Sequence, residues 1–207
     1  MHDDAFLVHI GGKLLDRPKP IEGAQLLVPD WLPDVPFSEP PVPAAVLIAL
    51  VARPGGRSLL FTQRSLGLRS HSGQVSFPGG KIDEGDADAG AAALREAREE
   101  VGLNPNNASI LGYMEPYQTG TNYVITPVVA VVEQEDAFVA NPKEVDEVFE
   151  VPLAYAARAR NYSRFVVRRN NIEHSTWQLD YGGHMIWGIT ANLTRHFRDL
   201  ALQELDI

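Results

Sequence analysis

The sequence contains no cysteine, which excludes disulfide bonds, thiol nucleophiles and zinc sites built on cysteine. Basic residues are also few, since 18 Lys and Arg stand against 27 Asp and Glu and leave a net charge of −9. This balance disfavours a nonspecific nucleic-acid binder, because a phosphate backbone is bound by a basic surface. An anionic substrate must instead be held by a bound cation and a few local Arg or Lys.

Long apolar runs are missing as well: none reaches membrane-spanning length, and the first ten residues lack the basic-then-apolar order of a signal peptide. We therefore expect a cytoplasmic protein without a membrane partner. With 44% apolar and 22% charged residues, the 207-residue chain has the composition of a globular protein. Eight of its 15 prolines precede residue 44. Residues 1–43 are predicted to form a proline-rich arm packed on the domain of residues 44–207, with a partly disordered leader as the alternative.

The most informative stretch runs from Phe77 to Leu103. It opens with a Pro-Gly-Gly turn that lets the backbone approach a ligand closely, and an acidic loop follows. Strong helix formers from Ala91 to Val101 predict a helix, with Asp88 placed to cap its start and Gly102 placed to end it. Continuous apolar residues at 44–51 predict a strand buried on both faces. A further strand is predicted at 109–117, Pro127 suggests an edge or a bulge in the strand that follows, and a last helix is predicted from Ile186 to about Leu202.

Three carboxylates share one stripe of the predicted helix. Glu96, Glu99 and Glu100 are spaced i, i+3, i+4, and Arg95 can pair with Glu99 at i, i+4. Oxygen ligands in this arrangement suit a hard cation such as Mg²⁺ or Mn²⁺. A solvated acidic helix face is the alternative interpretation.

The residues around this helix carry a family resemblance. The string from Gly80 to Leu103 resembles the Nudix box, Gly-x5-Glu-x7-Arg-Glu-U-x-Glu-Glu-x-Gly-U with U aliphatic. Asp86 stands where the box has its first Glu, and eight residues instead of seven separate it from Arg95. The resemblance implies an α/β fold, namely the Nudix α/β/α sandwich with a mixed β-sheet and a loop–helix–loop catalytic motif. It also implies metal binding by the three helix glutamates and the Gly80 carbonyl.

The stretch just before the box resembles a narrower signature. The coenzyme A pyrophosphatase subgroup of the Nudix superfamily has Leu-Leu-Thr-x-Arg-(Ser/Ala)-x3-Arg-x3-Gly-x3-Phe-Pro-Gly-Gly at this place. The chain matches it at Leu60, Thr62, Arg64, Ser65, Arg69, Gly73, Phe77, Pro78, Gly79 and Gly80, with Phe61 for the second Leu. This resemblance implies hydrolysis of coenzyme A or acyl-coenzyme A to 3′,5′-ADP and (acyl-)4′-phosphopantetheine.

The expected chemistry is hydrolysis of a diphosphate by a water molecule that Mg²⁺ or Mn²⁺ activates. Glu99 or Glu144 would accept the proton, and the residues alone do not decide between them. Arg95 would orient the glutamates. Glu144 is equally well explained as a solvated carboxylate on a strand edge.

A phosphate clamp is expected in the polar loop after residue 64. Arg64, Arg69 and His71 are its candidates, since guanidinium groups bind phosphate oxygens bidentately. A structural ion pair is the alternative for each Arg.

Two other functions stay open at this point. One is a Nudix hydrolase of another nucleoside diphosphate derivative, such as ADP-ribose or a dinucleotide. The other is a Nudix-fold binding module without catalysis, which the intact box glutamates disfavour. The oligomeric state is also open, with a homodimer among the alternatives.

Overall fold

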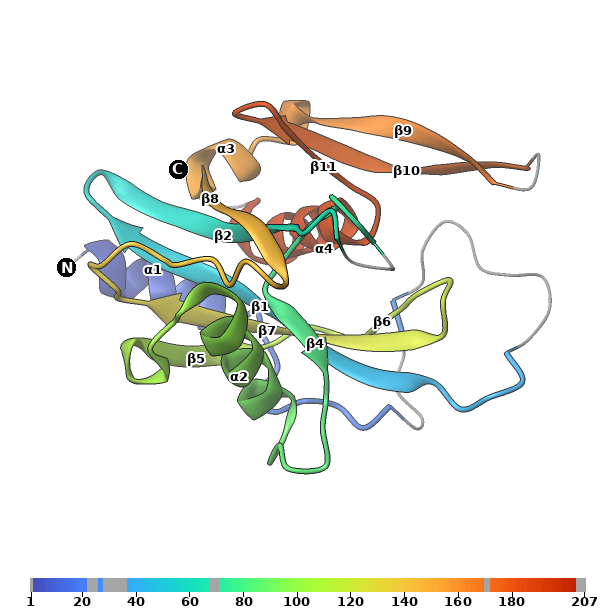
Figure 1. The fold of residues 1–207 in the computed structure, drawn as a ribbon. Helices are drawn as coiled ribbons and strands as arrows, with labels where there is room; N and C mark the ends of the chain where they lie inside the picture. The colour runs from blue at the N-terminus through green and yellow to red at the C-terminus, as the bar shows by residue number, and fades with distance from the viewer. Residues whose placement is uncertain (1, 22–25, 28–36, 68–70, 170–171, 204–207) are drawn as a thin grey trace.

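The computed structural model describes residues 2–21, 26–27, 37–67, 71–169 and 172–203. Its centre is a mixed sheet with helices on both faces (Figure 1). The strands of this sheet are β1 (Val42–Arg53), β2 (Gly56–Arg64), β3 (Val75–Ser76), β4 (Gly79–Lys81), β5 (Ala108–Tyr113), β6 (Tyr117–Gln118), β7 (Tyr123–Val132) and β8 (Val145–Pro152). A second, three-stranded sheet consists of β9 (Tyr162–Arg169), β10 (Ile172–Tyr181) and β11 (His184–Trp187).

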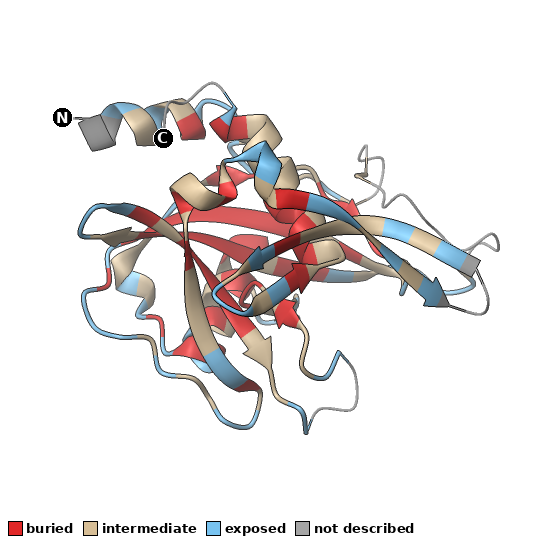
Figure 2. Cartoon of the chain, turned by 90° about the horizontal axis from the view of Figure 1, so that it is seen from above, coloured by how far each residue is buried: buried red, intermediate tan, exposed pale blue. Residues whose placement is uncertain are grey.

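Helices pack on either side of the main sheet. They are α1 (His2–Gly11), α2 (Ala89–Val101), α3 (Leu153–Ala156) and α4 (Ile189–Phe197), with the short turns η1 (Pro105–Asn107), η2 (Ala159–Asn161) and η3 (Arg198–Leu202). Two clusters of buried residues form the core, one beneath α2 and the other around α4 and α1. Figure 2 shows this burial concentrated in the strands of the main sheet. No described helix is both long enough and apolar enough to span a membrane.

Strand β1 lies at the centre of the main sheet, as its apolar run predicts. It runs parallel to β7, from the pair Val42–Tyr123 to the pair Val51–Val132. Successive β1 side chains enter opposite core clusters, because side chains alternate along a strand: Leu47 packs beneath α2, and Ile48 packs around α4. The prediction of a strand buried on both faces is therefore confirmed.

β1 and β2 separate along their length, and this separation creates the site. They pair at one end, where Leu50 lies opposite Leu59. Farther along, β1 pairs with β4 (Val46 with Gly79), and β2 pairs with β3 (Thr62 with Ser76). The connection from β3 to β4 therefore crosses from β2 to β1. It sets the glycine turn beside the centre of the sheet and against α2.

Three expectations drawn from the sequence need correction. A last helix beginning at Ile186 is wrong, because Ile186 lies in β11 opposite Leu179 and the helix begins only after Gly188, whose φ is 66°. The predicted strand from Ser109 to Tyr117 is two strands, β5 and β6. Of the edge or bulge that Pro127 suggests, the edge is wrong, because β7 has β1 on one side and β5 and then β6 on the other. The pairing of β5 with β7 does shift register close to this residue.

The described part of the first 43 residues contacts the main sheet. Ile10 of α1 is fully buried, and backbone bridges join Leu15 to Tyr113 and Leu27 to Tyr117. The interpretation of residues 1–43 as a separate arm stays a proposal, because residues 22–25 and 28–36 lie outside the described part.

Candidate active site

Helix α2 forms the base of the site, and its ends are fixed by its own sequence. The Asp88 carboxylate accepts a hydrogen bond from the Ala91 backbone N–H at 2.8 Å, and Gly102 adopts the left-handed conformation that ends the helix. Ala92, Ala93 and Ala97 are fully buried against the sheet. Because alanine side chains are small, the helix backbone can approach β1 and β4 closely.

The glycine turn beside α2 leaves room for carboxylates. A Cβ on Gly80 would lie 2.4 Å from the Glu96 Oε1, so that glutamate occupies the space a side chain would fill. A Cβ on Gly79 would lie 2.4 Å from the backbone oxygen of Ala45. The Gly79 N–H in turn donates to the Glu100 Oε2 at 3.2 Å. Glycine is therefore required at position 79 for packing against β1, and at position 80 to leave room for the carboxylate of Glu96.

Glu100 is a carboxyl group buried beneath this turn, with 1% of the residue exposed. Burial raises the pKa of Glu100 to about 7, and the Gly79 N–H and the Arg64 guanidinium offset only part of this effect. Arg64 Nη1 lies 3.7 Å from the Glu100 Oε1. Burial also raises the pKa of Glu96. The two carboxylates therefore need a positive charge that the described side chains supply only in part.

Arg95 holds the acidic groups of the helix and loop in place. Its guanidinium donates to both carboxylate oxygens of Asp86, at 3.0 and 2.9 Å, and to Glu96 at 2.9 Å. It also lies 3.5 Å from Glu99, the pair expected from the i, i+4 spacing. The hydrogen bond from Arg95 lowers the pKa of Asp86. Asp86, which departs from the box pattern, thus serves here to fix Arg95.

Glu144 approaches the same carboxylates from a separate loop. Its charge contributes to the raised pKa of both Glu96 and Glu100, which places it near them. Two backbone hydrogen bonds fix the loop: Asn141 N–H donates to the Glu100 carbonyl at 2.9 Å, and Ser65 N–H donates to the Glu144 carbonyl at 2.9 Å. Glu99 is the more exposed of the two candidate proton acceptors, with 53% of its side chain accessible. The geometry keeps both as candidates for the general base.

The donor set fits a hard divalent cation. Within the described ranges, no three acidic or histidine side chains are already gathered at metal-binding distances. The chemistry nevertheless suits Mg²⁺ or Mn²⁺, because the available donors are carboxylate and carbonyl oxygens. Buried Glu100, with its raised pKa, would regain its charged form beside such an ion. Glu96, Glu99, Glu100 and the Gly80 carbonyl are the residues that would hold it.

A cavity of about 830 Å³ begins at the glycine turn. Arg64 and His71, two of the predicted phosphate contacts, line it, while Arg69 lies outside the described residues. The buried Nε of Arg64 has no hydrogen-bond partner among the described residues, which leaves this donor unsatisfied. The His71 Nδ1 is 2.8 Å from the Gln74 side-chain oxygen. The cavity thus brings two of the three candidates to one space.

Sequence reasoning missed the far wall of the cavity, which comes from the C-terminal third of the chain. This wall comprises Val167, His174, Ser175, Thr176, Trp187, Gly188, Ile189, Thr190, Asn192 and Leu193. Asn192 fixes it by donating to the Tyr117 hydroxyl at 2.9 Å and accepting from Thr176 at 3.2 Å. These contacts join residues far apart in sequence, so no local sequence motif predicts them.

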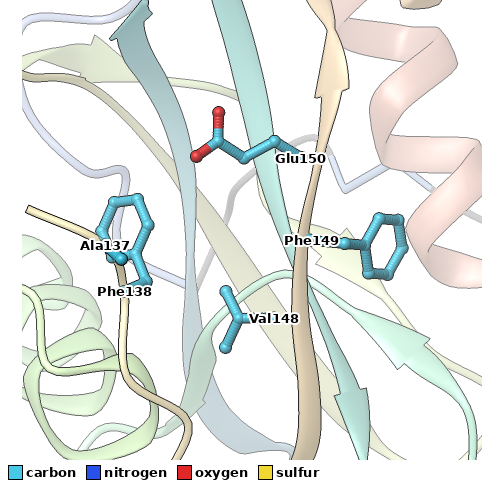
Figure 3. A pocket seen from close by; sticks show the side chains of 5 residues that line it. All are labelled: Ala137, Phe138, Val148, Phe149 and Glu150. Carbon is cyan, nitrogen blue, oxygen red and sulfur yellow. The ribbon is translucent and has the colours of Figure 1, made fainter.

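A smaller pocket of about 290 Å³ lies against β8, and Phe149 is among its lining residues (Figure 3). Phe138, Val148 and Glu150 line it together with Ala137, and Glu150 is paired with Arg53 at 2.6 Å. None of the predicted site residues that the structure describes borders this pocket. The large cavity, which borders Arg64, Gly79 and Gly80, is therefore the space next to the predicted site.

Comparisons with known proteins agree with this geometry. A family model described as the NUDIX domain matches residues 41–178. The uncharacterized Nudix hydrolase NudL of Escherichia coli (strain K12) is 44% identical over 160 residues, which cover 77% of this chain and 81% of the relative.

Two solved structures resemble parts of this chain. The Nudix hydrolase RenU from M. smegmatis has a TM-score of 0.48 and 24% identity, over 57% of this chain and 75% of that one. The binary complex of the C. elegans Ap4A hydrolase has a TM-score of 0.45 and 22% identity, over 55% of this chain and 81% of that one. The family match and the observed layers confirm the expected α/β architecture, a mixed sheet with helices on both faces. The chain belongs to the Nudix family and is a Nudix hydrolase.

Proposed function

We propose that this Nudix hydrolase cleaves the diphosphate linkage of coenzyme A, or of acyl-coenzyme A, in a reaction that depends on Mg²⁺ or Mn²⁺. The products are 3′,5′-ADP and (acyl-)4′-phosphopantetheine. The observation that carries the proposal is the cavity of about 830 Å³, whose lining includes Gly79 and Arg64, the two residues that contact the buried carboxylate of Glu100.

The size and lining of this cavity suit a long substrate with a charged centre. Its volume is near the upper end of the usual range of roughly 300–1,000 Å³ for ligand sites. Apolar and aromatic side chains such as Val75, Tyr117, Ile125 and Trp187 line it away from the carboxylates. An uncharged arm such as pantetheine fits this lining, because pockets that bind such groups are mostly apolar with a few polar contacts. The signature from Leu60 to Gly80 supports the same substrate.

The residues at the charged end have distinct roles in this proposal. Arg64 would donate its free Nε–H to a phosphate oxygen, since charge-assisted hydrogen bonds to phosphate are among the strong ones. Arg95 keeps Glu96 and Glu99 oriented through its bonds to Asp86 and to both glutamates. Glu99 or Glu144 would accept the proton of the attacking water. A divalent ion, when bound, lowers the pKa of water and neutralises charge on the attacked phosphate.

A substrate panel tests this proposal. Values of kcat/KM for coenzyme A, acetyl-coenzyme A, ADP-ribose and a diadenosine polyphosphate would be compared at one Mg²⁺ concentration, with products identified by mass. The proposal expects coenzyme A or its thioester to be preferred and 3′,5′-ADP to be released. Turnover of ADP-ribose or the dinucleotide without turnover of coenzyme A would contradict it. No turnover of any diphosphate would favour a binding module.

A further inference from the structure

Lys81, at the end of β4, faces the cavity and not the helix carboxylates. Adjacent side chains on a strand point to opposite faces. Position 80 faces α2, because a Cβ there would lie 2.4 Å from the Glu96 Oε1. Position 81 must then face the other way, and Lys81 is indeed among the residues that line the cavity. The backbone of Lys81 is fixed as well, since its carbonyl accepts a hydrogen bond from Arg95 at 3.1 Å.

Lys81 differs from the other basic residues of the cavity in having no partner for its charge among the described side chains. Arg64 lies 3.7 Å from Glu100, and the His71 ring lies 2.8 Å from the Gln74 side-chain oxygen. The Lys81 ammonium makes no ion pair or hydrogen bond with any side chain in the part of the chain that the structure describes. In a protein with a net charge of −9, such a cation is available to an anionic ligand.

We infer that Lys81 determines substrate specificity by binding a phosphate monoester that lies outside the diphosphate. This inference rests on the proposed function, because coenzyme A carries a 3′-phosphate on its ribose in addition to the diphosphate that is cleaved. The diphosphate already has Arg64 and the metal-binding carboxylates at the glycine turn. The 3′-phosphate needs a further cation close to the diphosphate contacts, and Lys81 directly follows Gly80 in sequence. An ammonium group suits this task, because it binds phosphate as a point charge.

The test compares coenzyme A with 3′-dephospho-coenzyme A, two substrates that differ only in this phosphate. Values of kcat/KM would be measured for wild type, Lys81→Met, Lys81→Arg and the control Lys143→Met. Lys143 is exposed, carries the same charge and does not line the cavity. Lys81→Met should lower kcat/KM for coenzyme A by about tenfold to a hundredfold, as expected for a lost charge-assisted hydrogen bond. Its activity on dephospho-coenzyme A should stay within about threefold of wild type, and Lys81→Arg should keep the preference for coenzyme A.

Binding of the product gives a second readout that does not require turnover. Lys81→Met should weaken binding of 3′,5′-ADP about as much as it lowers kcat/KM for coenzyme A, while binding of 5′-AMP should be unchanged. Equal losses on both substrates, or no loss on either, would overturn the role of Lys81 and leave the proposed function standing. Absence of coenzyme A turnover by wild type would overturn both.

Discussion

The two faces of the main sheet are built in different ways. On the α2 face, small side chains such as Ala45, Ala49 and Ala93 let helix and strand approach closely. The acidic side chains there are held by hydrogen bonds from Arg95. On the α4 face, larger side chains such as Phe61, Met114 and Phe197 form the core, and the cavity opens beside them. The first face fixes the position of the chemistry, whereas the second provides the space for a substrate. The predictions below aim to separate these two contributions.

The largest expected effect is on the α2 face. Glu100→Gln should lower turnover by about a hundredfold or more, because the site loses a charged oxygen ligand that no neighbour replaces. Folding should be kept, since the neutral amide avoids the burial of a charge. Steady-state kinetics at saturating Mg²⁺ and a thermal melt would measure both. Unchanged turnover would remove Glu100 from the site, and Glu133→Gln, an exposed change on the loop after β7, is the matched control.

The second prediction concerns the pH dependence of stability without metal. Because the pKa of Glu100 is raised from an ordinary 4.5 to about 7 in the folded state, its stabilising contribution is complete below about pH 4.5. This contribution is lost as the pH rises through about 7, and it amounts to roughly 3 kcal/mol at most. We expect the free energy of unfolding in EDTA to fall over this window.

The Glu100→Gln variant serves as the control for that window. Its free energy of unfolding should be flatter between about pH 4.5 and 7, because Gln does not titrate. The lowered pKa of Asp86 has the opposite sign, and its contribution is lost only as the pH falls through and below about 3.8. Denaturant unfolding at several pH values would measure the difference. Identical slopes for wild type and variant would show that Glu100 is not the titrating group.

Neighbouring glycines should respond differently to the same substitution. Gly79→Ala places a Cβ against the backbone of Ala45 and Val46, which cannot move easily, so it should destabilise the fold by roughly 1–3 kcal/mol. Gly80→Ala instead meets the flexible end of Glu96. It should leave the melting temperature nearly unchanged while lowering activity by displacing that carboxylate. Loss of activity without loss of stability in Gly79→Ala would contradict this division.

The α4 face should show a smaller effect that falls mainly on substrate binding. Asn192→Ala removes the acceptor of the Thr176 hydroxyl and the donor to the Tyr117 hydroxyl, at a cost of roughly 1–2 kcal/mol. Because Asn192 lines the cavity away from the carboxylates, KM for coenzyme A should rise more than kcat falls. A fall in kcat with unchanged KM would show that Asn192 affects the chemical step and not substrate binding.

The same contrast explains what the sequence could predict. The carboxylate helix, its two caps and the pairing of Arg95 with Glu99 all depend on residues within a few positions of each other, so spacing and propensity identify them. The strand β1 was predictable because its apolar residues are continuous. Arg64 and His71 both line the cavity, and their predicted contacts to phosphate stay a prediction.

The opposite wall of the cavity was not predictable from local patterns. Thr190 donates to the Val75 carbonyl at 2.9 Å across 115 positions, and no spacing rule connects two such residues. The segment from His184 to Trp187 has the apolar content of either a strand or a helix start. Its pairing with β10 and the left-handed Gly188 decide for the strand. The role of Asp86 could not be predicted from the sequence either, because it depends on the loop conformation that brings Asp86 to Arg95.

Coenzyme A hydrolysis by wild type, measured with Mg²⁺ and again after its removal with EDTA, tests the central claim most directly. The account predicts release of equal amounts of 3′,5′-ADP and 4′-phosphopantetheine with Mg²⁺, and loss of nearly all turnover without it. Turnover that persists at the same rate in EDTA would contradict the assignment of the carboxylates to a metal. Intact coenzyme A in the presence of Mg²⁺ or Mn²⁺ would contradict the proposed substrate.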